Sequence, residues 1–270
     1  MTPFDRAMQS LIYVLAGAIL FFLVAPVILV IPMSFSGSRY LDFPPETWSL
    51  RWYERLFTSI TWSNSLVVSV KLAIATMLVS TPIGVAAAYG LHISERPLLK
   101  KLQIVLLLPM IVPNIIIAIG LFYAFVRFNI LGSFAGLVAA HATMAVPFVL
   151  ITTLSALRSF DMSQEAVARS LGCSRAEAFF RVTLPQIRGG VFSGMLFAFV
   201  TSLDEVVIAL FVATGRNQTV TKVMFGSLRD ELDPTIAAVS VVLIVGTLSL
   251  GLVALIMRQA ATVRVHGPNR

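Results

Sequence analysis

Long apolar runs, separated by short polar stretches, constrain this chain more than any other feature of its sequence. The first run, Leu11 to Met33, contains no charged residue and lies between Arg6 and Arg39. A helix of about 20 residues crosses a hydrocarbon core of roughly 30 Å, so runs of this length predict membrane-spanning helices. With 57% hydrophobic and 12% charged residues among its 270, the composition excludes an ordinary soluble domain.

The sequence predicts an all-α membrane protein with six transmembrane helices. The six apolar runs are Leu11–Met33, Trp62–Leu91, Leu102–Val126, Ser133–Leu157, Gly189–Gly215 and Thr235–Met257. We expect the first run to be an uncleaved anchor, because a signal peptide has a shorter apolar region and a more basic start. Pro109 and Pro113 in the third run are tolerable in a membrane helix whose neighbours satisfy the freed carbonyl groups.

The runs divide the chain into three predicted parts. Residues 1–61 hold the first spanning helix and a polar stretch, 34–61, whose tryptophans and tyrosines suit an external interfacial loop. Residues 62–257 form a five-helix core, which includes a polar segment at 161–185. Residues 258–270 form a basic tail.

Lysine and arginine residues predict the orientation in the membrane. They are more numerous in the segments at 1–10, 92–101, 158–188 and 258–270 than in the opposite segments, where acidic residues balance them. By the positive-inside rule, both termini and the segment 161–185 are cytoplasmic. The net charge of +7 is therefore mostly a signal of topology, and nucleic-acid binding is not needed to explain it.

The polar segment 161–185, which we name the elbow, is expected to begin with a short helix. Asp161 or Ser163 can cap this helix, and Ala166 and Ala168 give it a face of small residues. Gly172 is expected to end it, because glycine readily adopts the left-handed conformation found after helix C-termini.

A second short helix is predicted in the remainder of the elbow. Ser174 and Glu177 have the spacing of a capping box. Pro185 disfavours a helical residue before it, so this helix should stop near Leu184, and Pro185 itself is suited to opening the next helix. An ordinary amphipathic loop held on lipid headgroups by its arginines is the alternative interpretation.

The elbow resembles the EAA loop of ABC-importer permeases. The resemblance rests on Glu165-Ala166, Gly172 and Val182-Thr183-Leu184-Pro185, with Val167 and Val182 in place of the family's Ala and Ile. It extends over about 62–257 and implies a type I importer permease core with one extra helix in front. In such permeases this loop forms a coupling helix that docks in a cleft of a separate ATPase subunit. The residues that the resemblance assigns to ATPase coupling are Glu165, Ala166, Ala168, Gly172, Leu184 and Pro185.

The same resemblance implies the partners of the chain. These are a second, homologous permease subunit, two ATPase subunits and a periplasmic or external substrate-binding protein. The motif G-x-x-x-x-G-K-[ST] does not occur in the sequence, so no P-loop binds ATP here. ATP and magnesium are expected in the partners, and the chain itself is expected to be a transport subunit with no cofactor, catalytic residue or metal site.

Polar residues inside the apolar runs are the candidates for a translocation pathway. Asp204 and Glu205 lie near the middle of the fifth run, where a carboxylate should face a cavity or a partner rather than lipid. Glu205 shares its helical face with small residues, so it is the better candidate for a packed or water-lined surface. Lys71 is the only cation inside a run, and a purely structural pairing with one of these acids is the alternative. Asn114 completes the candidate set.

Two segments, 201–211 and 226–244, together with Arg51–Phe57, resemble the second permease of spermidine/putrescine importers. That group commonly has an acidic residue where this chain has Asn114, which leaves amino-acid-like or opine-like solutes open as well. A different class of protein, an autonomous secondary transporter or channel, would use Asp204, Glu205 and His141 as an ion path. It would also be expected to show symmetric repeats, and no convincing repeat is visible. His141 is more simply interpreted as a helix-packing residue.

Overall fold

The computed structural model describes residues 3–94, 96–230 and 233–265, so the last five residues of the predicted tail lie outside the described part. Within these ranges the regular structure is helical, apart from an isolated antiparallel bridge between Ser36 and Trp48. The elements are α1 (Pro3–Ser34), α2 (Arg51–Thr58), α3 (Ile60–Ile93), α4 (Pro97–Leu107), the 3₁₀ turn η1 (Leu108–Met110), α5 (Asn114–Arg127), α6 (Phe134–Arg158), α7 (Ser163–Ser170), α8 (Arg175–Ala178), the π-helical turn η2 (Phe179–Thr183), α9 (Leu184–Asp204), α10 (Val207–Val212), α11 (Val220–Asp230) and α12 (Thr235–Val265).

Four of the described helices are long and apolar enough to cross a membrane: α1, α3, α6 and α12. The pair formed by α4 with η1 and α5 makes a fifth if this bent pair is one span. The described part of the chain thus confirms an all-α membrane protein with four to five candidate spans.

Two predicted spans are interrupted, which corrects the expectation of continuous helices. The third run bends by 100° between Met110 and Asn114. Pro113 precedes the first residue of α5 and has no N–H to continue a helix from Pro109. The fifth run breaks after Asp204, where Glu205 has an extended conformation, and resumes as α10.

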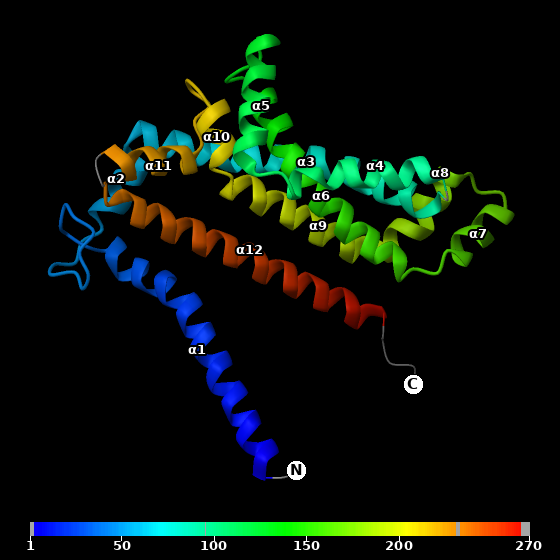
Figure 1. Ribbon diagram of the computed structural model, residues 1–270, viewed down its shortest axis with the longest axis horizontal. Helices are drawn as coiled ribbons and strands as arrows, with labels where there is room; N and C mark the ends of the chain where they lie inside the picture. Colours follow the sequence, from blue (N-terminus) through cyan, green and yellow to red (C-terminus); the bar gives the residue numbers. More distant parts are fainter. Residues whose placement is uncertain (1–2, 95, 231–232, 266–270) are drawn as a thin grey trace. The chain divides into compact units, whose positions relative to one another are not determined.

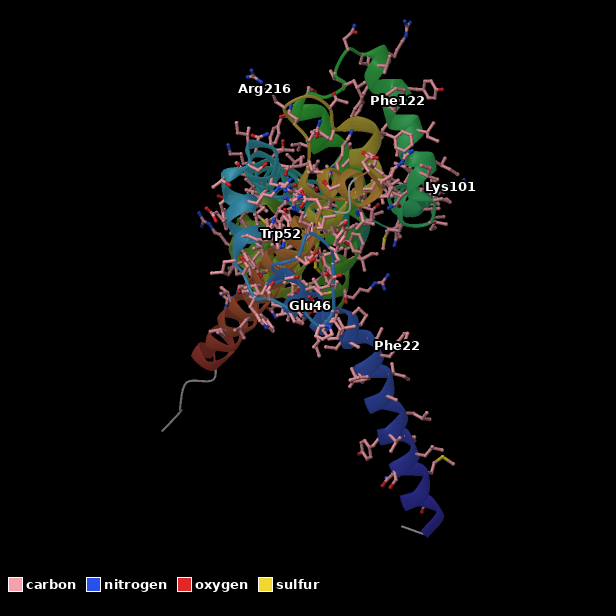
Figure 2. All side chains as sticks on the ribbon, turned by 90° about the vertical axis from the view of Figure 1, so that its left-hand side faces the viewer. Phe22, Glu46, Trp52, Lys101, Phe122 and Arg216 are labelled. Atoms are coloured by element: carbon pink, nitrogen blue, oxygen red, sulfur yellow. The ribbon has the colours of Figure 1, made fainter. Side chains whose placement is uncertain are left out.

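The chain forms two compact units, of which one comprises residues 1–63 and 226–250. Here the hydroxyl of Ser34 is 2.7 Å from that of Tyr53, and the Asp233 carboxylate accepts the N–H of Thr235 at the start of α12. Arg55 forms an ion pair with the same carboxylate at 3.2 Å. The apolar side chains of α1, including Phe22, are exposed along its length (Figure 2).

The other unit, residues 64–225 and 251–270, has its core around α6 and α9, which run side by side (Figure 1). Close approach of these helices depends on two glycines of α9 at GxxxG spacing. A Cβ on Gly190 would overlap Ala156 and approach the carbonyl oxygen of Thr152 to 2.8 Å, and one on Gly194 would be 2.6 Å from the Thr152 hydroxyl. Small residues at this spacing let membrane helices pack backbone to backbone.

Candidate functional site

The first helix of the elbow, α7, begins at Ser163, and its N-cap residue is Met162, which makes no side-chain cap. Neither of the two predicted residues is therefore the N-cap, but the carboxylate of Asp161 accepts the backbone N–H of Ser163 at 3.0 Å. This hydrogen bond, with a second from the Ser163 hydroxyl, lowers the pKa of Asp161. Gly172 follows the end of α7 with φ +97°, a conformation that side-chain-bearing residues rarely adopt.

The second helix, α8, has the predicted capping box. The Ser174 hydroxyl accepts the N–H of Glu177 at 3.3 Å, and the Glu177 carboxylate accepts the N–H of Ser174 at 2.8 Å. Hydrogen bonds from the backbone and then the hydroxyl of Ser174 lower the pKa of Glu177.

The predicted stop near Leu184 is wrong. The chain passes from α8 through η2 directly into α9, and Pro185 lies in the first turn of α9 as expected. Proline lacks an N–H and its ring collides with the carbonyl group four residues earlier in a regular helix. A widened π-helical turn before Pro185 accommodates this without ending the helical path.

Glu165 points into the protein and is only 3% exposed. The hydroxyl of Tyr89, on α3, donates to its Oε1 at 2.5 Å. The hydroxyl of Thr183, at the end of η2, donates to its Oε2. One carboxylate therefore connects α7 to both α3 and the start of α9. The pattern at 161–185 contains Thr183 but gives no sign of Tyr89, and neither had been predicted as a site residue.

The opposite face of the elbow is exposed. Val167 and Leu171 are 59% and 81% exposed, and Ala166 lies beside them on the surface. Ala168 and Leu184 are half-buried, and Pro185 is exposed. Large apolar side chains exposed together on a polar segment indicate a surface that contacts a protein or a membrane.

The two interrupted helices meet at Glu205, whose side chain is buried. Its Oε1 accepts the N–H of Ile208 at 2.9 Å and so caps α10. Its Oε2 accepts the side-chain amide of Asn114 at 3.3 Å, at the start of α5. The backbone oxygen of Glu205 accepts the hydroxyl of Thr221 at 3.0 Å. The structure thus brings together two of the four predicted pathway residues.

The other end of α10 is held by Lys222. Its Nζ donates to the carbonyl oxygens of Leu210 at 3.0 Å and Ala213 at 2.6 Å. Burial lowers the pKa of Lys222. In the sequence, Lys222 counted only as one of the basic residues on the side of the membrane opposite the elbow.

Among the described residues, no side-chain hydrogen bond found joins Asp204 or Lys71 to this cluster, and both side chains are exposed. The one ion pair found between described side chains joins Arg55 to Asp233, so Lys71 pairs with neither Asp204 nor Glu205. The structural pairing considered for Lys71 is not present. If the fifth run crosses the membrane as predicted, this exposed carboxylate should face a cavity or a partner, because facing lipid costs several kcal/mol.

His141 joins three helices in the buried core. Its Nδ1 is 2.9 Å from the Ser202 hydroxyl on α9, and this hydroxyl donates to Thr76 on α3 at 3.3 Å. The predicted packing role of His141 agrees with this arrangement. Within the described ranges, no group of three or more His, Cys, Asp or Glu side chains could hold a metal ion.

Interrupted helices that meet near a buried polar group, on a helical membrane scaffold, are an arrangement known from solute transporters. Residues 80–262 match the family described as "Binding-protein-dependent transport system inner membrane component". The chain belongs to this family, as its resemblance to ABC-importer permeases predicted.

Individual relatives within this family are named as polyamine permeases. The chain is 31% identical to the spermidine/putrescine transport system permease protein PotC of Haemophilus influenzae, over 87% of this chain and 90% of the relative. It is 28% identical to the putrescine transport system permease protein PotI of Escherichia coli strain K12, over 99% and 97% of the two chains. The fold is similar to that of a bacterial alginate ABC transporter solved with a periplasmic protein that carries an alginate pentasaccharide, with a TM-score of 0.75, 17% identity and 96% of each chain covered.

Proposed function

We propose that this permease admits a polyamine, or an amino-acid-like or opine-like solute, by alternating access driven by separate ATPase subunits. Two ATPase subunits, a second homologous permease and an external binding protein complete the complex. Two polyamine permeases among the relatives, similar over nearly the whole chain, support this cargo class. Family membership and the exposed apolar face of the elbow support the ATPase partners.

The proposed topology has six spans with both termini in the cytoplasm. To the candidate spans of the structure it adds α9 with α10 as one interrupted crossing. Clustered lysine and arginine residues at 92–101 and 158–188 support a cytoplasmic elbow. The proposed parts of the chain remain 1–61, 62–257 and 258–270, with the elbow inside the second.

The observation that carries the coupling proposal is the two-sided arrangement of α7. Its outer face presents Val167 and Leu171 to a partner, whereas Glu165 on its inner side bonds to α3 and η2. Movement of an ATPase against the outer face would be transmitted through the Glu165 carboxylate to α3 and to η2, which leads into α9. In this proposal the ATPase docks on the exposed apolar face of α7, and Glu165 connects α7 to the rest of the permease.

Purification from native membranes through a tag on this chain tests the function. We expect the ATPase subunits and the second permease to co-purify, and proteoliposomes to take up labelled putrescine only with ATP and the binding protein present. Binding of polyamines and amino-acid derivatives to the binding protein identifies the cargo. A chain that runs alone and transports without ATP contradicts the proposal.

Leu171→Arg tests the docking face. A charge at the exposed tip of the elbow should reduce ATPase co-purification about tenfold or more, the equivalent of ~1.4 kcal/mol of binding. Leu98→Arg is the matched control, because Leu98 is similarly exposed but lies on α4. Equal retention of the ATPase by both variants contradicts docking through the elbow.

A further inference from the structure

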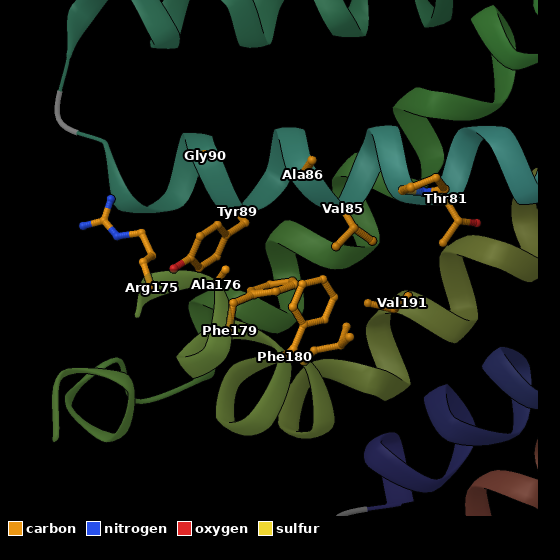
Figure 3. Close-up of a pocket in the computed structure, with 12 residues that line it drawn as sticks. Thr81, Val85, Ala86, Tyr89, Gly90, Arg175, Ala176, Phe179, Phe180 and Val191 are labelled. Carbon is orange, nitrogen blue, oxygen red and sulfur yellow. The ribbon is translucent and has the colours of Figure 1, made fainter. Parts of the chain in front are cut away.

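An apolar groove lies between the last turns of α3 and the beginning of α9. Its volume is about 770 Å³, and small-molecule pockets typically span ~300–1,000 Å³. Val85 and Tyr89 of α3 form one wall, and Phe179 and Phe180 of η2 with Val191 of α9 form the other (Figure 3).

The groove is elongated along α3. Its lining on that helix runs from Thr81 to Gly90, a distance of about 13 Å at the rise of an α-helix. Phe180 and Ala86 on its walls are exposed, so the groove opens to the outside of the chain. An apolar groove whose lining extends this far suits an extended hydrocarbon chain.

The end of the groove near the terminus of α3 is positively charged. Arg175 lies there beside Tyr89 and Gly90, away from Thr81 (Figure 3). A second hollow, of about 670 Å³, shares Gly90 and Arg175 and adds Arg96. Neither arginine is ion-paired with a described acidic side chain. An apolar channel therefore leads to two arginines that are available for an anion.

We infer that the groove binds an anionic phospholipid, with one acyl chain between α3 and η2 and the phosphate between Arg96 and Arg175. This inference rests on the proposed orientation, which places this end of α3 at the cytoplasmic leaflet, where anionic lipids attract basic side chains. A helix of the sister permease is the competing occupant. Two arginines without an ion-pair partner among the described residues, beside an apolar groove, match a lipid better than an apolar helix.

Native mass spectrometry of the complete complex measures the binding, with phosphatidylglycerol and phosphatidylcholine as probes. We expect the purified complex to retain phosphatidylglycerol in preference to phosphatidylcholine. Arg96→Ala and Arg175→Ala should each reduce the preference about fivefold. Arg158→Ala is the matched control, because this exposed arginine at the end of α6 lines neither hollow.

Ala86→Trp tests the acyl-chain part separately. The exposed position of Ala86 accepts the larger ring, which fills the groove while both arginines remain. We expect this variant to retain no phosphatidylglycerol above the phosphatidylcholine level. Ile83→Trp, on α3 but outside the groove lining, should retain it like the unmodified complex.

Unchanged preference in both the arginine variants and Ala86→Trp overturns the inference. So does efficient cross-linking of Ala86→Cys to the sister permease in a complex that holds no lipid. ATPase retention and ATP-dependent uptake in phosphatidylcholine vesicles are measured on the same preparations. If these persist while lipid preference is absent, only the lipid site is wrong; if the ATPase never co-purifies, the proposed function is wrong.

Discussion

The carboxyl group of Glu165 lies on the side of α7 that faces away from solvent. A buried carboxylate is tolerated when hydrogen bonds replace its lost hydration, and here two hydroxyl groups donate to it. Those donors come from residues 76 and 18 positions away in the chain. The carboxylate therefore fixes the position of α7 relative to two other helical segments.

Tyr89→Phe and Thr183→Val each remove one donor to Glu165 and leave the outer face of the elbow unchanged. A hydrogen bond to a charged group contributes about 1.5–3 kcal/mol, so α7 should be held less firmly. We expect ATPase retention to stay near normal, whereas the amount of solute transported per ATP hydrolysed falls. Paired measurements of uptake and phosphate release in proteoliposomes give this ratio.

Tyr123→Phe is the control for Tyr89→Phe. Tyr123 lies on α5 and its side chain is 70% exposed, so loss of its hydroxyl should leave the ratio unchanged. A normal ratio in both Tyr89→Phe and Thr183→Val would mean that Glu165 does not transmit movement. Loss of the ATPase from these variants would instead place its docking on the inner side of α7.

Gly172→Ala isolates the conformation of the turn between α7 and α8. No heavy atom lies within 4 Å of an added Cβ, so the expected cost comes from φ +97° alone. A left-handed residue with a Cβ costs about 1–2 kcal/mol, and the turn should relax into another conformation. We expect ATP hydrolysis to continue with reduced uptake. Gly189→Ala is the control, because its added Cβ also meets open space but Gly189 has no positive φ. If Gly189→Ala lowers uptake as much as Gly172→Ala does, the left-handed conformation is not the cause.

Local features of the elbow could be predicted from the sequence because each depends on residues three or four positions apart. The capping box of Ser174 and Glu177 and the turn at Gly172 are examples. The bond between Tyr89 and Glu165 could not, because it depends on how α3 packs in the folded chain. The motif identified Glu165 as a coupling residue but did not indicate which way its side chain faces.

The packing of α9 on α6 depends on the absence of side chains at Gly190 and Gly194. Gly190→Ala should destabilise the complex by about 1–3 kcal/mol, because the new methyl group overlaps Ala156 and the backbone of Thr152. Thermal unfolding in detergent measures the loss. Gly189→Ala, one position away and facing open space, should unfold at the unmodified temperature. Equal melting of the two variants would show that α6 and α9 separate easily.

The two helix breaks differ in how far the sequence could reveal them. Pro109 and Pro113 mark the first, although a membrane helix can tolerate proline, and the sequence alone did not decide between a kink and a break. The second, after Asp204, contains neither proline nor glycine. It depends on Glu205 capping α10 and on Lys222 binding the carbonyl groups at its other end. The Glu205 contact joins residues three positions apart, whereas the Lys222 contacts form only when α11 packs against α10.

Apolar runs were sufficient to predict a helical membrane protein, and the elbow was sufficient to predict the family. The number of spans was harder to predict, because run length does not distinguish one crossing from two shorter helices joined at a bend. The residues that meet the transported solute were harder still to predict. A sequence places Asp204 and Glu205 side by side, whereas the structure buries one and exposes the other.

The two carboxylates should therefore respond differently to substitution in the complete transporter. Asp204 is exposed and has no ion-pair partner among the described side chains, so Asp204→Asn should lower uptake of labelled putrescine about tenfold, the equivalent of ~1.4 kcal/mol, without loss of assembly. Glu205→Ala removes the cap of α10 and the partner of Asn114, so it should lower the unfolding temperature and the yield of complex. Asp230→Asn, at the exposed end of α11, is the control for both measurements. Normal uptake by Asp204→Asn together with defective uptake by a stably assembled Glu205→Ala would reverse the assignment, because the buried carboxylate would then be the one that meets the cargo.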